Sequence, residues 1–274
     1  MTNQTLGNDE NGVKPSRNDS GQLESGMIRL QVINLPARAD RRAQFITWND
    51  RPGVEINFID ATIGAMLDRD DLIMRNLLAP DATGFTTGAL GNALSHHKLW
   101  LAARSAATPT FICEDDCCLR ADFITQATTL IRQISSAWDI IFFGYNTNAT
   151  VTVQSDDGLK VLLDFDESAK RVSGYYDAFA RTQSAAPTLL KCYQAWGTLA
   201  YAITPQGAQR LVDLCFPLTT ATPISMFGQN RSIKPYTLDG MINLALQRRR
   251  IVGYCAFPPL AVSANDVAGS DVVS

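Results

Sequence analysis

Short apolar runs alternate along the chain with segments in which apolar residues recur at helical spacing. The runs are rich in Val, Ile, Leu and Phe, as buried strands are. They lie at residues 27–35, 54–61, 109–114, 138–144, 188–203 and 251–257. The helical patterns lie at residues 36–50, 68–78, 84–106, 121–137, 205–215 and 236–249. This alternation predicts an α/β fold with a mostly parallel central sheet and helices on both faces.

Two parts of the chain interrupt this alternation. Residues 1–26 are rich in Asn, Ser, Gly and charged residues, and we interpret them as a disordered tail. Residues 145–187 are polar, carry scattered aromatic residues and lack a clear period, which is typical of functional loops. We therefore predict a single domain over residues 27–274, with a variable region at about 145–187.

Composition narrows the possible functions. The net charge is −3 and 46% of the residues are hydrophobic, so a core can form and electrostatic binding of nucleic acid is not indicated. No segment is apolar enough to span a bilayer, and the polar first residues do not form a signal peptide. We expect a cytoplasmic protein that reaches any membrane-linked acceptor from the inner face of the membrane.

The six cysteines do not form a recognisable metal or disulfide pattern. Cys113, Cys117 and Cys118 are close in sequence, but no second pair has the spacing of a closed zinc site. We expect reduced, mostly buried cysteines that pack as small apolar residues, which indicates a reducing compartment.

The stretch TFICEDDCCL, residues 110–119, joins an apolar run to three consecutive acids. Ligands bind beyond the carboxyl ends of strands in open parallel sheets, which favours a functional role for Glu114, Asp115 and Asp116. Adjacent carboxylates repel unless a cation compensates them, and oxygen ligands suit Mg²⁺ or Mn²⁺. In an extended chain Glu114 and Asp116 face one side and Asp115 the other. A solvated acidic turn or a helix N-cap explains the same residues equally well.

Four blocks, in this order, resemble glycosyltransferase family 25, which includes bacterial lipooligosaccharide galactosyltransferases and collagen galactosyltransferases. They are VINLPARADRR at 32–42, GALGNALSHHKLW at 88–100, ICEDD at 112–116 and GTLAYAITPQGAQRLV at 197–212. PYTLDGMINLAL at 235–246 and GSDVV at 269–273 are weaker matches. The resemblance implies a nucleotide-sugar-binding fold of the GT-A type, a UDP-sugar donor and a divalent metal, Mn²⁺ or Mg²⁺.

The resemblance also assigns residues to the donor. Those expected at the nucleotide sugar are Asn34, Leu35, Arg38, Arg42, Ser95, Glu114, Asp115, Gly197 and Thr198. Asp116 and Glu114 are the expected metal ligands, and the metal would neutralise the diphosphate leaving group. Asp115 is expected to anchor the loop. Arg38, Arg41 and Arg42 lie in the turn after the first strand, where surface arginines that solvate a helix are an alternative interpretation.

Two residues are candidates for catalysis. His96 follows Ser95 on a helix expected to begin near the donor, although a lone histidine on a helix is also typical of a core. Inverting transfer needs a base that deprotonates the acceptor hydroxyl, and Asp239 is the candidate, with N-capping as its alternative. The chain has no histidine besides His96 and His97, so a third metal ligand would be Asp239, Asp271 or water.

The sequence departs from the family pattern in the second block. Ala89 stands where many members have an acid, and Asn92 where many have cysteine. The leading hypothesis is an inverting, metal-dependent transferase that moves a hexose, expected to be galactose, from a UDP-sugar to a saccharide acceptor such as lipooligosaccharide. A catalytically silent nucleotide-sugar-binding module and a transferase acting on a protein or peptide are the alternatives.

Overall fold

The computed structural model describes residues 27–263, and a large mixed sheet lies at its centre. Its main path has the strand order β2-β1-β3-β9-β5-β12-β8-β6-β7, and β13 joins β4 to β5 beside it. The strands are β1 (Ile28–Asn34), β2 (Val54–Asp60), β3 (Thr110–Glu114), β4 (Cys117–Leu119), β5 (Ile140–Gly144), β6 (Val151–Gln154), β7 (Lys160–Leu163), β8 (Thr188–Gln194), β9 (Ala200–Ile203), β12 (Gly253–Phe257) and β13 (Ala261–Ser263). A separate hairpin pairs β10 (Ile224–Met226) with β11 (Arg231–Ile233).

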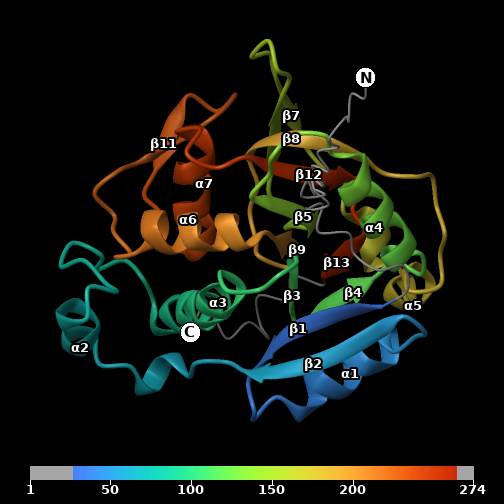
Figure 1. Ribbon diagram of the computed structural model, residues 1–274, viewed down its shortest axis with the longest axis horizontal. Helices are drawn as coiled ribbons and strands as arrows, with labels where there is room; N and C mark the ends of the chain where they lie inside the picture. The colour runs from blue at the N-terminus through green and yellow to red at the C-terminus, as the bar shows by residue number, and fades with distance from the viewer. Residues whose placement is uncertain (1–26, 264–274) are drawn as a thin grey trace, which may run out of the picture.

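Helices cover both faces of this sheet (Figure 1). The α-helices are α1 (Ala39–Asn49), α2 (Arg69–Met74), α3 (Thr87–Ala103), α4 (Phe123–Gln133), α5 (Tyr175–Phe179), α6 (Pro205–Cys215) and α7 (Leu238–Gln247). Two 3₁₀ turns, η1 (Gly64–Met66) and η2 (Ser168–Arg171), complete the described elements. The predicted α/β class is therefore confirmed.

The strand sequences explain why there are two cores. Along β5, Ile140 and Phe142 join the cluster under α3, α6 and α7, whereas Ile141 and Phe143 join the cluster under α1 and α4. Side chains alternate between the faces of a strand, so a continuous apolar run fills both cores at once. The uninterrupted run in β5 is thus a consequence of its central position.

The sheet is less parallel than predicted. β2, β1, β3, β5, β12 and β6 run in one direction, which is six of the nine strands on the main path, and β9, β8 and β7 run in the other. β9 lies antiparallel between β3 and β5, and so its first residues meet the carboxyl end of β3. The strands β8 and β9, which both come from the apolar run at 188–203, do not pair with each other.

The helices α3 and α6 each begin after a threonine whose side chain caps the first turn. Thr86 caps α3 by accepting a hydrogen bond from the Ala89 amide at 3.1 Å, and Thr204 caps α6 in the same way from Gly207. Pro205 occupies the first turn of α6, where its missing N–H costs nothing. Both helices lie within the predicted helical patterns, at residues 84–106 and 205–215.

Residues 145–187 contain more regular structure than their sequence indicates. They form the β6–β7 hairpin, η2 and the five-residue helix α5. Figure 1 shows this segment running from the hairpin to α5, which lies beside β4 and α1. Trp48 of α1 donates its indole N–H to Asp177 at 3.0 Å, which ties α5 to the first helix. The variable region therefore begins with strands at one edge of the sheet, and its helix α5 lies beside β4, which directly follows the three acids.

All six cysteines are free and buried, as predicted. Cys117 and Cys118 lie in β4, paired with Ser263 and Val262 of β13. Burial raises the pKa of both thiols, to about 12 for Cys118. They are packing residues in a strand, not metal ligands. The predicted tail at residues 1–26 and the GSDVV block, with Asp271, lie outside the described residues.

Candidate functional site

The three acids occupy a tight turn between β3 and β4. Glu114 is the last residue of β3, and Asp115 and Asp116 form the turn. The Glu114 amide donates to Leu199 O at 2.9 Å, so the loop before β9 is fastened to this point. The assumption of an extended chain through Asp116 was wrong, because the chain reverses here to enter β4.

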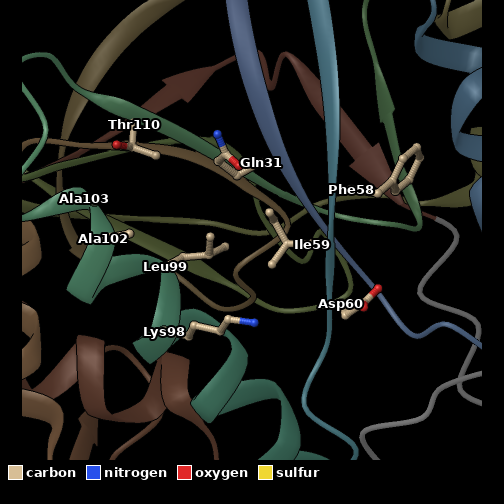
Figure 2. Close-up of a pocket in the computed structure, with 9 residues that line it drawn as sticks. All are labelled: Gln31, Phe58, Ile59, Asp60, Lys98, Leu99, Ala102, Ala103 and Thr110. Carbon is tan, nitrogen blue, oxygen red and sulfur yellow. The ribbon is translucent and has the colours of Figure 1, made fainter.

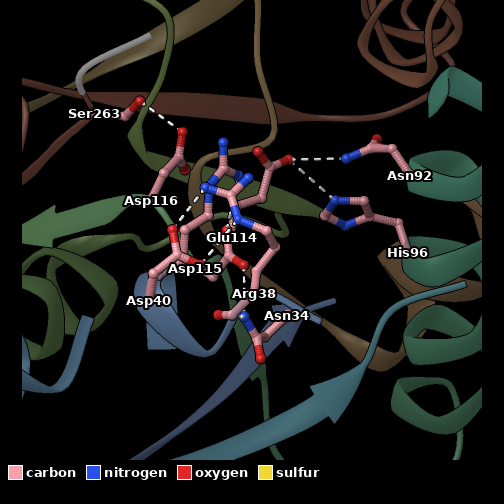
Figure 3. Close-up of polar contacts among 10 residues, drawn as sticks. Asn34, Arg38, Asp40, Asn92, His96, Glu114, Asp115, Asp116 and Ser263 are labelled. Carbon is pink, nitrogen blue, oxygen red and sulfur yellow. Dashed lines mark hydrogen bonds and ion pairs between the residues drawn. The ribbon is translucent and has the colours of Figure 1, made fainter. Parts of the chain in front are cut away.

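Glu114 lies at the centre of a converging set of hydrogen-bond donors (Figure 3). Its Oε1 accepts from Asn92 Nδ2 at 3.2 Å, from His96 Nε2 at 3.3 Å and from the Thr198 hydroxyl. Two of these donors come from α3 and one from the loop before β9. No described residue donates to Oε2, so the second oxygen is available to a ligand.

Opposing effects act on the Glu114 carboxyl. Burial raises its pKa, but the hydrogen bonds from His96, from the hydroxyl of Thr198 and from the amide of Asn92 outweigh burial. The net pKa is lowered. Glu114 is therefore an anion held in a partly dry setting, which suits a role in binding sugar hydroxyls or a cation.

Asp115 fastens the turn to the first strand and helix. Its Oδ2 accepts from Asn34 Nδ2 at 2.7 Å, and its Oδ1 accepts from Arg41 Nη1 at 3.2 Å. The side chain is buried, and burial is the main reason that its pKa is raised. These contacts are those of the loop anchor that the sequence suggested.

We expect Asp115→Ala to lower the free energy of unfolding by about 2 to 4 kcal/mol, because it removes a buried carboxylate that accepts from the Asn34 amide and pairs with the Arg41 guanidinium. Urea unfolding followed by circular dichroism measures the change. Asp213→Ala, which removes an exposed aspartate of α6 that accepts from the Gln209 side chain, is the control and should change the free energy by less than about 0.5 kcal/mol. Equal stabilities for the two variants would contradict the anchoring role.

Asp116 differs from its neighbours because part of it is unsatisfied. Its Oδ2 accepts from the Ser263 hydroxyl at 2.9 Å, whereas its buried Oδ1 has no hydrogen-bond partner. Burial, and next the negative charge of Glu114, raise the pKa of Asp116 to about 6. A buried carboxylate oxygen without a partner is costly, and a cation or a ligand hydroxyl would offset that cost.

The loop before β9 brings Gly197 and Thr198 to the same place. Gly197 has a φ of +86°, and a side chain there would meet Asn146 Oδ1 at 2.4 Å. Its amide donates to Asp239 Oδ2 at 2.7 Å, while Asp239 Oδ1 accepts from the Gly240 amide and the Thr237 hydroxyl. Asp239 thus joins the start of α7 to the loop that carries Thr198. Burial raises the pKa of Asp239.

Ser95 and His96 are neighbours on α3, but their side chains make different contacts. Ser95 Oγ donates to Gly91 O at 2.7 Å and accepts from the Thr62 amide at 2.8 Å, so it holds the segment after β2 against α3. A side chain at Gly91 would meet Thr62 O at 2.6 Å, which explains the glycine in this block. His96 faces Glu114, whereas His97 packs on Phe216 with ring centroids 4.3 Å apart.

The arginines are distributed differently from the prediction. Arg41 and Arg42 lie in the first turn of α1, not in the loop before it. Arg38 forms a fork on Asp40 with bonds of 3.0 and 2.9 Å. Arg42 stacks over the Phe58 ring at 4.4 Å, away from the acids, and Arg41 is the arginine that reaches Asp115. Leu35 lies half-buried in the turn after β1, where its carbonyl accepts from the Arg38 amide at 2.8 Å.

Three participants were missed from the sequence: Asn92, Tyr201 and Ser263. Asn92 was noted only as a departure from the family, yet it donates to Glu114. Tyr201, in the fourth block, is by its sequence more typical of a core residue than of one that packs beneath the sugar, and its hydroxyl bonds His96 at 2.7 Å. Ser263 lies far along the chain and reaches Asp116 only because β13 pairs with β4. The i, i+4 spacing of Asn92 and His96 was the one signal available.

A cavity of about 460 Å³ lies elsewhere, along the edge strand β2 and the second half of α3 (Figure 2). Apolar side chains of Ile59, Leu99 and Ala103 line it, with Lys98 and Asp60 at one end (Figure 2). None of the residues that surround Glu114 or Asp116 lines this cavity. Within residues 27–263, no three His, Cys, Asp or Glu side chains are grouped to hold a metal ion.

The sequence of this chain is similar to a known protein family, and the matched region includes the residues around Glu114. The family model described as glycosyltransferase family 25 (LPS biosynthesis protein) matches residues 27–226, which include β1, the acidic turn, α3 and the loop before β9. The chain belongs to glycosyltransferase family 25. The resemblance seen in the four sequence blocks is thereby confirmed, and the residues around Glu114 are those that the family model covers.

Individual members of family 25 are distant in sequence. A glycosyltransferase 25 family member of Drosophila melanogaster is 26% identical over 85% of this chain and 35% of its own length. Procollagen galactosyltransferase 2 of Mus musculus is 24% identical over 74% of this chain and 30% of its own length. The chain spans about a third of the length of these curated relatives. An inositol-1-phosphate CTP transferase structure from T. maritima aligns over 88% of the chain at 13% identity and a TM-score of 0.36, too distant to inform the comparison.

Proposed function

We propose that this family 25 chain is a glycosyltransferase that moves a hexose, galactose, from a UDP-sugar to a saccharide acceptor such as lipooligosaccharide, through a GT-A-type donor site at the carboxyl end of β3. One observation carries the proposal. A single carboxylate, Glu114, is fixed by donors from α3 and from the loop before β9, beside the unsatisfied Asp116. Family membership and the names of the relatives support the reaction class and the sugar.

A divalent cation fits part of this site. The unpartnered Oδ1 of Asp116 and the unoccupied Oε2 of Glu114 are hard oxygen donors from neighbouring acids, which Mn²⁺ and Mg²⁺ accept. Two carboxylates leave most coordination positions to water and to a diphosphate, as Mg²⁺ commonly requires. When bound, the ion would neutralise the leaving diphosphate. Asp116 is the proposed ligand, and Glu114 is shared between the ion and the sugar or ribose.

Asp239 is the proposed base for inversion. Its Oδ2 accepts one hydrogen bond, from the Gly197 amide, which leaves a lone pair for the acceptor hydroxyl. The raised pKa, caused mainly by burial, increases its basicity. Gly197 and Thr198 would then lie between the base and Glu114, where the transferred sugar is expected.

The acceptor side is assigned to residues 145–187. Lys170 in this region donates to Ser263 O at 3.0 Å, and Ser263 Oγ donates to Asp116. The acceptor region and the acidic turn therefore share one serine. Within the described part of the chain, no helix combines the length and the apolarity that crossing a bilayer requires. We place the reaction in the cytoplasm, at the inner face of the membrane if the acceptor is lipid-linked.

A thermal-shift panel of UDP-galactose, UDP-glucose, UDP-N-acetylglucosamine and GDP-mannose, each with and without Mn²⁺, tests the proposal. Ligand that binds the folded state stabilises it by about 2.7 kcal/mol at 100 times its Kd. We expect the largest increase in Tm from UDP-galactose with Mn²⁺. Equal and negligible shifts for all donors would contradict the donor site. Donor binding without turnover on any saccharide or peptide acceptor would contradict the transferase assignment.

A further inference from the structure

A buried line of hydrogen bonds leads from the interior of α3 to Glu114. Trp100 Nε1 donates to the Tyr201 hydroxyl oxygen at 2.8 Å, and that oxygen lies 2.7 Å from His96 Nδ1. His96 Nε2 then lies 3.3 Å from Glu114 Oε1. Trp100 and His96 are fully buried and Tyr201 is 1% exposed. Four polar side chains thus form one line that ends at the proposed donor site.

The chemistry of the two ends determines where the hydrogens lie. An indole N–H only donates, so the Tyr201 oxygen accepts from Trp100. A carboxylate only accepts, so His96 Nε2 carries a hydrogen and donates to Glu114. Among the described residues, His96 Nδ1 is the one acceptor within reach of the Tyr201 hydroxyl hydrogen. Only the Nε2–H tautomer, with Tyr201 donating to Nδ1, leaves no buried hydrogen without an acceptor.

We propose that Trp100 and Tyr201 are positioning residues, which fix His96 in its Nε2–H tautomer so that it holds the Glu114 carboxylate in place for the nucleotide sugar. The ligand part of this statement rests on the proposed function. The tautomer is a property of the folded chain alone. In the sequence, His96 and Trp100 belong to one family block and Tyr201 to another. In the structure, hydrogen bonds connect all three to Glu114.

The local structure explains why the line is rigid. His96 and Trp100 are four residues apart on α3, so both project from the same face of the helix toward β9. Tyr201 lies opposite Ile112 of β3, two residues before Glu114 on that strand. Helix and strand backbones therefore set both ends, and no loop intervenes. With Oε1 restrained by three donors, rotation of the carboxylate is limited and Oε2 keeps its direction.

Nuclear magnetic resonance reads the tautomer directly. The chain has two histidines, and a His97→Gln variant labelled with ¹⁵N-histidine leaves one imidazole to observe. We expect the hydrogen on Nε2 and none on Nδ1, in the absence of any ligand. A hydrogen on Nδ1, in the neutral or the charged ring, would overturn the proposal without any variant of the line itself.

Tyr201→Phe removes the donor to Nδ1 and should give a mixture of tautomers, with affinity for UDP-galactose and Mn²⁺ reduced roughly three- to tenfold in calorimetry. Tyr145→Phe is the matched control, because its hydroxyl is equally buried but donates to Ala256 O at 3.0 Å. It should keep the single tautomer and the affinity. Trp100→Phe, which frees the Tyr201 oxygen, provides a second test if Tyr201→Phe does not fold.

The outcomes separate the two proposals. If Tyr201→Phe matches Tyr145→Phe in both tautomer and affinity, the positioning role is wrong. If no variant and no unaltered protein binds a UDP-sugar, the proposed function is wrong, and the positioning of a donor-binding carboxylate falls with it. In that case the ligand-free spectrum still decides whether Trp100 and Tyr201 fix the imidazole.

Discussion

Replacing Asp116 by asparagine is expected to reduce sugar transfer by about a thousandfold or more and to leave the protein more stable than before. The loss of activity follows from removing the negative charge of the proposed metal ligand. The gain in stability follows from burial and from the charge of Glu114, both of which disfavour the Asp116 carboxylate. Function and stability therefore change in opposite directions at this one position.

The sign of the stability change follows from proton linkage. The pKa of Asp116 is about 6 in the folded protein and near the ordinary value of 3.8 in the unfolded chain. The folded state therefore binds this proton more readily, so the contribution of Asp116 to stability is present below about pH 4 and is lost as pH rises through 6. At pH 7 without metal, the asparagine variant should be more stable by roughly 2 kcal/mol.

Urea unfolding at pH 4 and pH 7, together with a transfer assay, measures both effects. Asp213→Asn is the control, because Asp213 is an exposed aspartate of α6 that lies outside residues 145–187 and accepts from Gln209 at 2.9 Å. It should leave transfer unchanged and stability within about 0.5 kcal/mol at both pH values. Full activity in Asp116→Asn would remove Asp116 from the metal assignment. A loss of stability at pH 7 would show that the carboxylate is not strained in the folded protein.

Replacing Gly197 by alanine is expected to cost about 2 to 4 kcal/mol of stability and to abolish donor binding. The alanine would have to adopt a φ of +86° with its Cβ 2.4 Å from Asn146 Oδ1. Relief of that contact moves the loop. The Thr198 hydroxyl, which donates a hydrogen bond to Glu114, moves with it. Both the amide bonded to Asp239 and the hydroxyl bonded to Glu114 would shift together.

Gly158→Ala separates backbone strain from the steric clash. Gly158 has a φ of +94°, but no atom lies within 4 Å of the position its Cβ would take. The variant should cost about 1 kcal/mol and keep its affinity for UDP-galactose. Denaturant unfolding and calorimetry on both variants make the comparison. Equal losses for the two would show that the contact with Asn146 does not constrain the loop.

The sequence was most informative where a single pattern determined the result. The apolar run of β5 and the helical patterns at residues 84–106 and 205–215 predict elements that the structure contains at similar residues. The acids at the end of β3 were identified as candidate site residues from their position in the sequence, because ligands bind beyond the carboxyl ends of strands in α/β sheets. The order of four blocks identified the family without any of them being decisive.

The remaining features depend on contacts between distant parts of the chain. Nothing in the sequence shows that β13 pairs with β4, which is what brings Ser263 to Asp116. Three consecutive acids fit an extended chain and a solvated turn equally well, so the sequence did not decide that the chain reverses at Asp115. Tyr201 reads as a core residue, and it is buried. Its hydroxyl matters only because His96 and Trp100 of α3 happen to face it.

One helix restrains the backbone next to the proposed donor site at two points. Asp239 and Asn243, one turn apart on α7, accept the amide hydrogens of Gly197 and Ala195 at 2.7 and 2.9 Å. The segment that carries Thr198 is therefore ordered before any substrate arrives, and binding energy from the nucleotide sugar is not spent on freezing it.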